Sequence, residues 1–315
     1  LTSRRLIVAD SGQTWLDELF AEAYEQAAPS DRAAADSLRR WLEYKRRSIS
    51  AAPQNWLALY RGDVPVGLAQ GAGVVRVFHT HFFYLSPAFQ RDEMVFSALE
   101  KLDELALRRR CNTISFEGAR TTPVVKTLGV NRLVEAGFTW HERIHLRRCM
   151  QGNLRGPFHC EGFEVGPLRL LPEDVARLMA VETEAFQHAE CDHPGELPSD
   201  FSDGYRTTLI PKAALSALAR DDSGVIRGAL YAEEQGCTAW IHTLFVEPAW
   251  RHQKIATALL DHCLCIHQEA GYTATELMVL AANFPAVHLY ETAGFEEVKR
   301  EDLFIRKMTR HDVAG

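Results

Sequence analysis

The pattern of apolar and polar residues occurs twice along the chain, in the same order in each half. In the first half an apolar run at 81–89 contains a proline near its end and precedes helical spacing over 96–109. In the second half the run at 242–250 precedes helical spacing over 257–271. A proline cannot continue the hydrogen-bond ladder of a strand, so each half predicts a strand, a turn and a helix.

Each half also predicts a hairpin upstream of this unit, a short strand downstream and a final helix closed by Gly-Phe. The hairpin, the strand and the final helix span 55–70, 112–118 and 122–138 in the first half. In the second half they span 213–234, 274–281 and 286–295. The matching order indicates a duplication. The predicted fold class is therefore α/β, with two tandem domains that each contain a mixed, mostly antiparallel sheet flanked by helices.

The boundary between the predicted domains lies in a stretch rich in glycine and proline. Helical or strand periodicity is lost over 150–174, before a helix predicted at 173–186. We place the boundary near Gly156, which gives domains of 1–155 and 156–315. The alternative is that 150–174 is one strand with its flanking loops.

Charge and composition restrict the partners. The formal net charge is -7 and the pI is about 6.0, which argues against a nucleic-acid binder because such proteins need a cationic surface. The seven cysteines form no CxxC pair, no apolar run is long enough to span a bilayer, and the first residues lack the apolar stretch of a signal peptide. We expect a cytoplasmic protein, monomer or homodimer, that acts on a small molecule.

The segment 244–260 passes from a strand through a tight loop into a helix. Backbone N–H groups at a helix start have no intrahelical partner, and the helix dipole adds partial positive charge there. Arg251 and Lys254 place cationic side chains at the same end. The segment therefore predicts a site for a phosphate-bearing ligand.

Two motifs in the second half resemble those of the GNAT superfamily of acyltransferases. Arg251 and Ala256 match the first motif, which is Arg or Gln, two residues, Gly, one residue, then Gly or Ala. Asn283 followed by AVHLYETAGF over 286–295 is similar to the second. Lys254 stands where the family usually has glycine, which leaves open whether the backbone can approach the pyrophosphate closely; a helical φ at that position would tolerate a lysine.

The resemblance implies an acyl-CoA co-substrate, acetyl-CoA being the first choice, and no metal. It places the acyl group between two strands that part, at 239–246 and 275–280, where main-chain amides meet the acyl carbonyl. The implied cofactor-binding residues are Leu244, Phe245, Val246, Arg251, His252, Gln253, Lys254, Ile255, Ala256, Thr257, Asn283 and Tyr290.

Three residues are candidates for proton transfer. By the resemblance Tyr290 would protonate the departing thiolate, and a tyrosine is a proton source at neutral pH. His242 lies nine residues before Arg251, as the catalytic histidine does in arylalkylamine-type members, and is the first candidate base. Glu233, with Glu234, is the second candidate, acting through a water. The alternatives are a core-edge tyrosine, a structural histidine and solvated glutamates.

Strand alternation places Trp240, His242, Leu244 and Val246 on one face of the predicted strand. The loop at 184–201 lies where the family covers the acceptor, so its polar residues could select the substrate. They are His188, Glu190, Asp192 and His193. A metal site is the weaker interpretation, both there and among His262, Cys263, Cys265 and His267, because neither group has the spacing of a structural zinc site.

The first half lacks these features. Its corresponding loop keeps Gln90 but has Asp92 and Glu93 in place of small residues, and carboxylates would repel a pyrophosphate. Val134 replaces the tyrosine of the second half. We predict that this domain is catalytically silent and binds no acyl-CoA.

The predicted function is N-acyl transfer, in which the primary amine of a small molecule attacks the acyl-CoA thioester directly. Another acyl group or an oxygen acceptor is a variant of this reaction. A non-catalytic acyl-CoA or metabolite sensor is the alternative from another class, and would bind the coenzyme without turnover. A protein-interaction scaffold would bind none.

Overall fold

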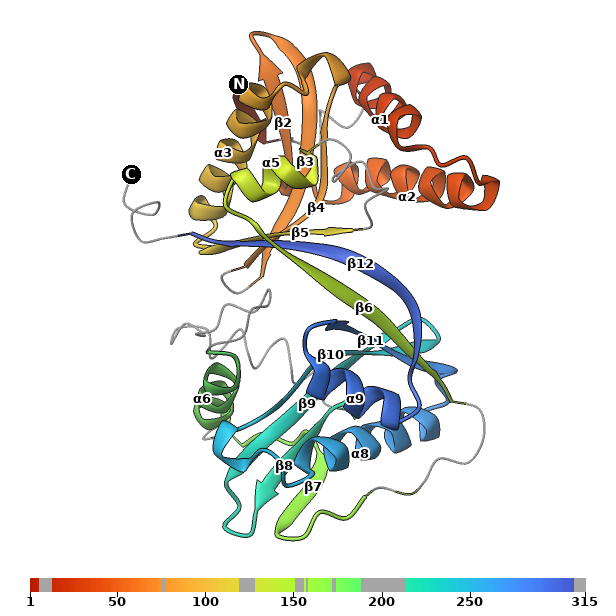
Figure 1. Ribbon diagram of the computed structural model, residues 1–315, viewed down its shortest axis with the longest axis vertical. Coiled ribbons are helices and arrows are strands. Elements are labelled where there is room, and N and C mark those ends of the chain that lie inside the picture. The colour runs from red at the N-terminus through yellow and green to blue at the C-terminus, as the bar shows by residue number, and fades with distance from the viewer. Residues whose placement is uncertain are drawn as a thin grey trace. The chain divides into compact units, whose positions relative to one another are not determined.

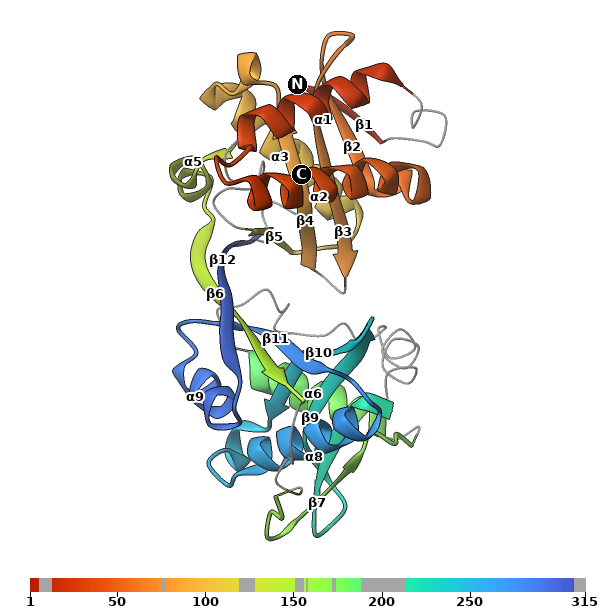
Figure 2. The same ribbon diagram turned by 90° about the vertical axis from the view of Figure 1, so that its right-hand side faces the viewer.

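The computed structural model describes residues 1–5, 13–74, 77–118, 128–150, 156, 158–171, 174–187 and 214–308. The chain forms two compact units. Unit 1 contains Leu1–His141 and Glu301–Gly315, and unit 2 contains Glu142–Arg300. Figures 1 and 2 show their elements, and each unit is described by itself below.

Unit 1 is a sheet with helices on both faces (Figure 1). Its strand order is β1-β2-β3-β4-β5-β12, antiparallel throughout except for the parallel pair β4 and β5. The strands are β1 (Thr2–Arg5), β2 (Trp56–Arg61), β3 (Val64–Val74), β4 (Val77–Leu85), β5 (Thr113–Gly118) and β12 (Glu296–Lys307). The helices are α1 (Thr14–Ala27), α2 (Arg32–Ala51), α3 (Asp92–Arg108) and α5 (Val130–Glu135).

Alternation along β2 explains why both faces of this sheet are covered. Trp56 and Ala58 pack in the core cluster formed with α1 and α2. Leu57 and Leu59 pack in the cluster formed with α3 and α5. Successive strand residues point to opposite faces, so an apolar run without polar interruptions requires a hydrophobic layer on each side.

Unit 2 repeats this arrangement, with α6 on one face of its sheet and α8 and α9 on the other (Figure 1). Its strand order is β6-β11-β10-β9-β8-β7, and the parallel pair is β10 and β11. The strands are β6 (Thr139–Cys149), β7 (Phe163–Pro167), β8 (Ala217–Asp221), β9 (Ile226–Gln235), β10 (Thr238–Val246) and β11 (Ala274–Leu280). The helices are α6 (Asp174–Phe186), α8 (Ile255–Glu269) and α9 (Phe284–Thr292).

Each unit takes one strand from the other half of the sequence. β6, which precedes residue 150, pairs with β11 in unit 2, from Ala274 opposite Cys149 to Leu280 opposite Arg143. β12, at the end of the described chain, pairs with β5 in unit 1, from Asp302 opposite Gly118 to Lys307 opposite Thr113. Phe304 of β12 is fully buried in the core of unit 1.

The predicted fold class is confirmed, and the described elements of both halves share the order strand, helix, three strands, helix, strand, helix and strand, with α2 as an additional helix of the first half. The predicted division at 155 and 156 concerns the two sequence repeats, whereas the compact units divide after His141 and after Arg300. The difference arises because sequence periodicity identifies a strand but not the strand with which it pairs.

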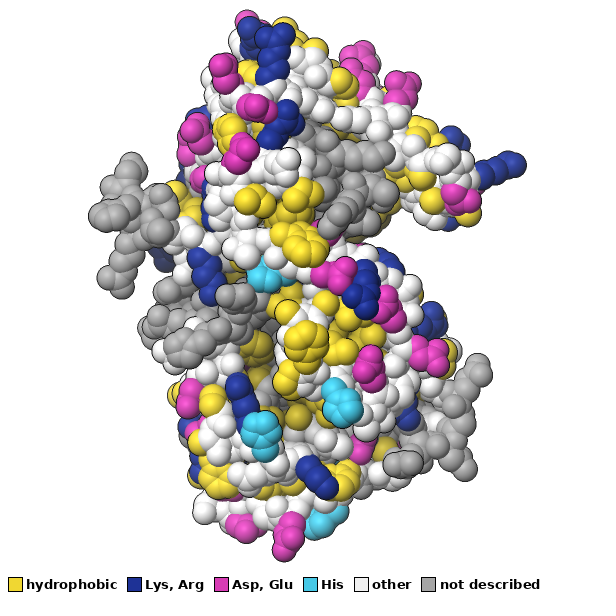
Figure 3. Space-filling view, viewed as in Figure 1, with side chains coloured by type: hydrophobic (Ala, Val, Ile, Leu, Met, Phe, Trp, Pro, Cys, Tyr) yellow, Lys and Arg dark blue, Asp and Glu magenta, His cyan; other side chains and the backbone are white. Residues whose placement is uncertain are grey.

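Two surface properties complete the fold. Lys and Arg side chains are interspersed with Asp and Glu side chains over the described part of the face in Figure 3. Among the described helices, none combines the length and the apolarity required to cross a lipid bilayer.

Candidate functional site

The central strands of unit 2 separate at one end. β10 and β11 pair in parallel from Thr238 opposite Ala274 to Ile241 opposite Leu277, and no further. Both strands continue beyond this point, to Val246 and to Leu280. Backbone groups of a strand that lose a neighbour become available to a ligand. The separation that the resemblance implied between these strands is present.

His242 lies where the strands separate. The pairing of β10 with β9 contains a bulge between Ile241 and Thr243, so His242 has no partner residue on β9. A bulge redirects a side chain, and here the imidazole Nε2 lies 2.6 Å from the Glu233 carboxylate oxygen Oε1. The two side chains are 39% and 27% exposed, respectively. The two candidate bases are therefore in direct contact, and they form an ion pair when the imidazole is protonated.

The bulge also corrects one prediction. Trp240, His242, Leu244 and Val246 do not share a face, because Leu244 and Val246 pack with Ile241 in the core beside α8. Alternation holds only along an uninterrupted ladder, and one extra residue reverses it.

Sequence reasoning missed the neighbours of this pair. Trp240 lies opposite Glu233 on β9 and opposite Glu276 on β11, so the three side chains form a row across the sheet. Arg147 of β6 lies opposite Glu276, and His145, two residues away on the same strand, has Nε2 2.9 Å from Glu276 Oε2 and its ring 5.4 Å from that of Trp240. No local signal identifies His145, because β6 comes from the other sequence half.

The loop between β10 and α8 has an unusual backbone. His252 and Lys254 have φ of 64° and 62°, the left-handed region in which only glycine is unstrained. Residues 251–254 are exposed, and Lys254 caps α8 without a side-chain hydrogen bond. The N–H groups of the first helical turn, from Ile255 to Thr257, therefore have no intrahelical partner and are available to an anion.

The φ of Lys254 is thus not the helical one that would tolerate a lysine, and the family's glycine preference has its usual reason here. Strained non-glycine residues persist where the backbone shape serves a ligand. Arg251 is held beside this loop by hydrogen bonds from Nε to the Val246 carbonyl and from Nη2 to the Ala185 carbonyl, at 3.4 and 3.1 Å.

We expect Lys254→Gly to be more stable than Lys254→Ala by about 1 kcal/mol, because both variants lose the side chain but only glycine adopts this φ without strain. Urea unfolding at equal m-value measures the difference. Equal midpoints for the two variants would show that the loop relaxes to another φ.

A network of charged side chains holds the turn that precedes the loop. Glu247 accepts hydrogen bonds from Arg227 and Arg177, and the Arg227 guanidinium lies 4.4 Å from the centre of the Trp250 ring. Burial alone would raise the pKa of Glu247, but the two arginines outweigh it and lower that pKa. The carboxylate therefore stays ionised, and the turn Pro248–Trp250 is fixed between β10 and the loop.

Tyr290 and Asn283 belong to α9. Tyr290 is 6% exposed and packs against Phe295 in the core beside α8, and burial raises its pKa. Its hydroxyl makes no hydrogen bond with the residues that the structure describes, so it can still donate to a ligand. The Asn283 side chain accepts from the Ala286 N–H and caps α9.

The remaining predicted cofactor residues line the same edge of unit 2. Leu244 and Val246 contribute side chains to the core, and Phe245 packs against Tyr231 on the opposite face. Ile255 is buried, while Ala256 and Thr257 are partly buried. The side chains of Phe245, Val246 and Ile255 are buried, so these three residues can meet a ligand only through their main chain.

The polar loop residues His188, Glu190, Asp192 and His193 lie outside the described residues. Packing explains the second group, the histidines and cysteines of α8. Cys263 is buried, and His267 contacts both the Thr275 hydroxyl and the Leu215 carbonyl. Within the described ranges, no three His, Cys, Asp or Glu side chains converge as metal ligands.

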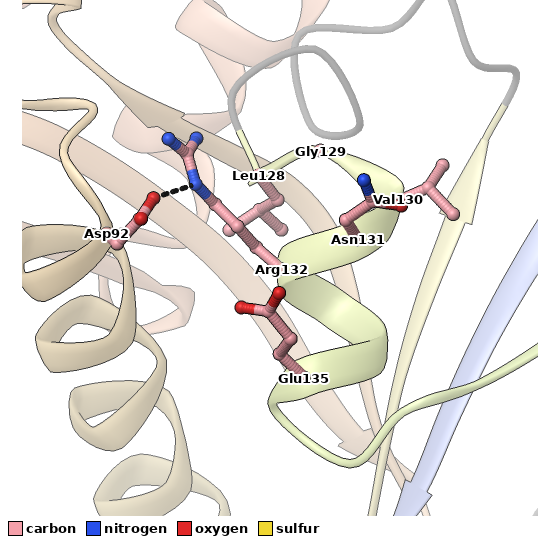
Figure 4. A pocket seen from close by; sticks show the side chains of 7 residues that line it. All are labelled: Asp92, Leu128, Gly129, Val130, Asn131, Arg132 and Glu135. Carbon is pink, nitrogen blue, oxygen red and sulfur yellow. Dashed lines mark hydrogen bonds and ion pairs between the residues drawn. The ribbon is translucent and has the colours of Figure 1, made fainter.

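Unit 1 has a different structure at the corresponding loop. Arg132 of α5 donates to Asp92 at the start of α3, at 2.6 Å, and to the Gln90 carbonyl at 2.9 Å (Figure 4). A cavity of about 480 Å³ lies beside this pair and includes Glu135 in its wall. The Asp92 carboxylate occupies the helix start that an anion would need. That unit 1 binds no acyl-CoA stays a prediction.

A sheet that separates beside a strand–loop–helix anion site is the arrangement that defines the GNAT class of acyltransferases. Residues 176–295 match the acetyltransferase (GNAT) family.

The relatives agree with this assignment. A mycothiol acetyltransferase from Propionibacterium freudenreichii subsp. shermanii is 31% identical over 136 residues, which cover 41% of this chain and 42% of the relative. The match thus spans less than half of the relative's length.

Solved structures extend the similarity of fold to nearly the whole chain. A GCN5-related N-acetyltransferase from Sphaerobacter thermophilus is similar with a TM-score of 0.62 at 19% identity, over 97% of this chain and 95% of that one. A tandem GNAT protein from the clavulanic acid biosynthesis pathway gives 0.53 at 12% identity, over 97% and 98%. At such identities the likeness shows the tandem fold alone.

Proposed function

We propose that this protein is an acetyl-CoA-dependent N-acetyltransferase whose acceptor is the primary amine of a small molecule and whose single active site lies in unit 2. The match of residues 176–295 to the acetyltransferase (GNAT) family supports acetyl transfer. The observation that supports an amine acceptor is the ion pair between His242 and Glu233, located where β10 and β11 separate.

The pair suits a base for an ammonium group. Donation from the Nε2–H of His242 to Glu233 leaves Nδ1 with its lone pair, and the carboxylate stabilises the imidazolium that forms. Nδ1 takes the proton of the bound ammonium, and the neutral nitrogen then attacks the thioester carbonyl carbon. The Trp240 ring beside this pair offers a face to the cationic acceptor.

Departure of the thiolate requires a proton on the other side of the reacting carbon. Tyr290 retains its phenolic proton at neutral pH, because burial raises its pKa, and it donates that proton to the sulfur as the carbon–sulfur bond breaks. The strand amides of β10 beyond Ile241, which have no neighbour on β11, hold the oxyanion. No covalent enzyme intermediate is needed.

The proposal predicts one acetyl-CoA site that depends on the loop. Calorimetric titration of the full chain with acetyl-CoA should give one equivalent, and Arg251→Glu should weaken binding by about 100-fold or more, because a carboxylate replaces a charge-assisted contact to phosphate. Arg169→Glu makes the same charge change at an exposed position beyond β7 and should bind like the wild type.

Turnover is measured separately, as release of the coenzyme thiol with a panel of small primary amines. Binding without turnover for any amine would favour a sensor over the proposed enzyme. Two equivalent sites would show that Asp92 and Arg132 do not prevent acetyl-CoA from binding to unit 1. No binding at all would refute the acetyltransferase.

A further inference from the structure

A second group of titratable side chains lies in unit 1, on the sheet face covered by α1 and α2. β4 and β5 pair in parallel only from Val77 opposite Thr113 to Thr80 opposite Phe116, and then separate. The pairing of β4 with β3 contains a bulge that leaves His81 without a partner residue. His81 therefore occupies the position in unit 1 that His242 occupies in unit 2.

The neighbours of His81 are polar and close together. The rings of His79 and His81 are nearly parallel, with centres 6.1 Å apart. Nδ1 of His79 lies 3.0 Å from the buried Ser115 hydroxyl and 3.4 Å from the Glu117 carboxylate. Four side chains that carry or exchange protons thus meet where the strands part.

Lys45 of α2 brings a positive charge onto this group. It is only 8% exposed, and its ammonium donates one hydrogen bond, to the Gln70 side chain at 2.8 Å. An ammonium has three N–H donors, and within the described residues no carboxylate lies within salt-bridge distance of it. A buried lysine without a close counter-ion is costly and is retained rarely without a use.

The pKa shifts of Lys45 and His81 agree with an incompletely neutralised charge on Lys45. Burial lowers the pKa of Lys45 to about 8, although Glu117 opposes this shift. Burial also lowers the pKa of His81, and the positive charge of Lys45 lowers it further. An anion placed between these groups would relieve both effects.

We propose that Lys45, His79 and His81 bind the oxyanion group of a small molecule, a carboxylate or a phosphate, so that unit 1 is a ligand-binding domain in its own right. Glu117 supplies the counter-charge in the unliganded chain, and the incoming anion displaces it. Ser115 and Gln70 hold His79 and Lys45 in position. This site is independent of acetyl transfer in unit 2.

The test uses the full chain with labelled histidines, observed by NMR while inorganic phosphate or acetate is added at constant ionic strength in chloride. We expect saturable shifts of the His79 and His81 ring resonances, which His79→Asn and His81→Asn assign. Lys45→Met should weaken the binding about tenfold or more, because a charged hydrogen bond is lost. Arg40→Met removes an exposed charge from the same helix and should change nothing.

Each outcome decides the question. Saturation with phosphate alone or with acetate alone supports the proposal and identifies the group recognised. Absence of saturation with both anions in the wild type overturns the proposal, whether or not Lys45→Met folds. Equal affinity in the wild type and Lys45→Met also overturns it. Arg251→Glu should leave the shifts intact, so the result does not depend on the acetyl-CoA site.

Discussion

A fragment of residues 156–315 is expected not to fold cooperatively, whereas a fragment of residues 142–300 is expected to fold. The fragment 156–315 lacks β6, whose Ile144 and Leu146 are buried in the core of unit 2. Losing two such side chains costs about 4–10 kcal/mol, comparable with the about 5–15 kcal/mol that stabilises a whole domain. Thermal unfolding followed by circular dichroism compares the two fragments.

A third fragment, 142–315, controls for length. It contains β6 and also carries β12 without its partner β5, so it should unfold at the same temperature as 142–300. Cooperative unfolding of 156–315 at that temperature would show that β6 is dispensable, and would restore the sequence repeat as the folding unit.

The second large effect is expected at the ion pair in unit 2. His242→Asn should lower kcat by about 10²- to 10⁴-fold, the usual contribution of a positioned base, and leave acetyl-CoA affinity unchanged. Glu233→Gln should lower kcat by a smaller factor, because the imidazole remains but its proton is no longer held by a charge. Thiol release with an amine that supports turnover measures both.

The neighbouring residue provides a matched control. Glu234 follows Glu233 on β9 and is exposed, so Glu234→Gln makes the same chemical change away from His242. Its kcat should equal that of the wild type. An unchanged kcat in His242→Asn would exclude the imidazole as the base, and an equal loss in the two glutamine variants would indicate a general charge effect.

Much of the fold could be predicted because it is local. Hydrophobic period predicted the hairpins, the central strands and the helices that follow them, and Gly-Phe marked the end of each final helix, whereas β1, α1, α2, β6 and β12 were not predicted. The anion loop at Arg251 could also be found, since it depends on consecutive residues.

The features that sequence did not reveal are the ones that depend on pairing. The bulge at His242 and the separation of β10 from β11 are properties of two strands at once. The positive φ of Lys254 could not be inferred, because lysine carries no preference for that conformation, and the family's glycine was the better guide. His145 was missed for the reason that β6 belongs to the first half of the sequence.

The exchanged strands also set an order for folding during synthesis. Domains usually complete themselves from the N-terminus as the chain leaves the ribosome. Here unit 2 is complete once Arg300 has emerged, whereas unit 1 still lacks the part of β12 from Glu301 to Lys307. The unit that begins first therefore closes last, and until then the edge of β5 stays open to unwanted pairing with other chains.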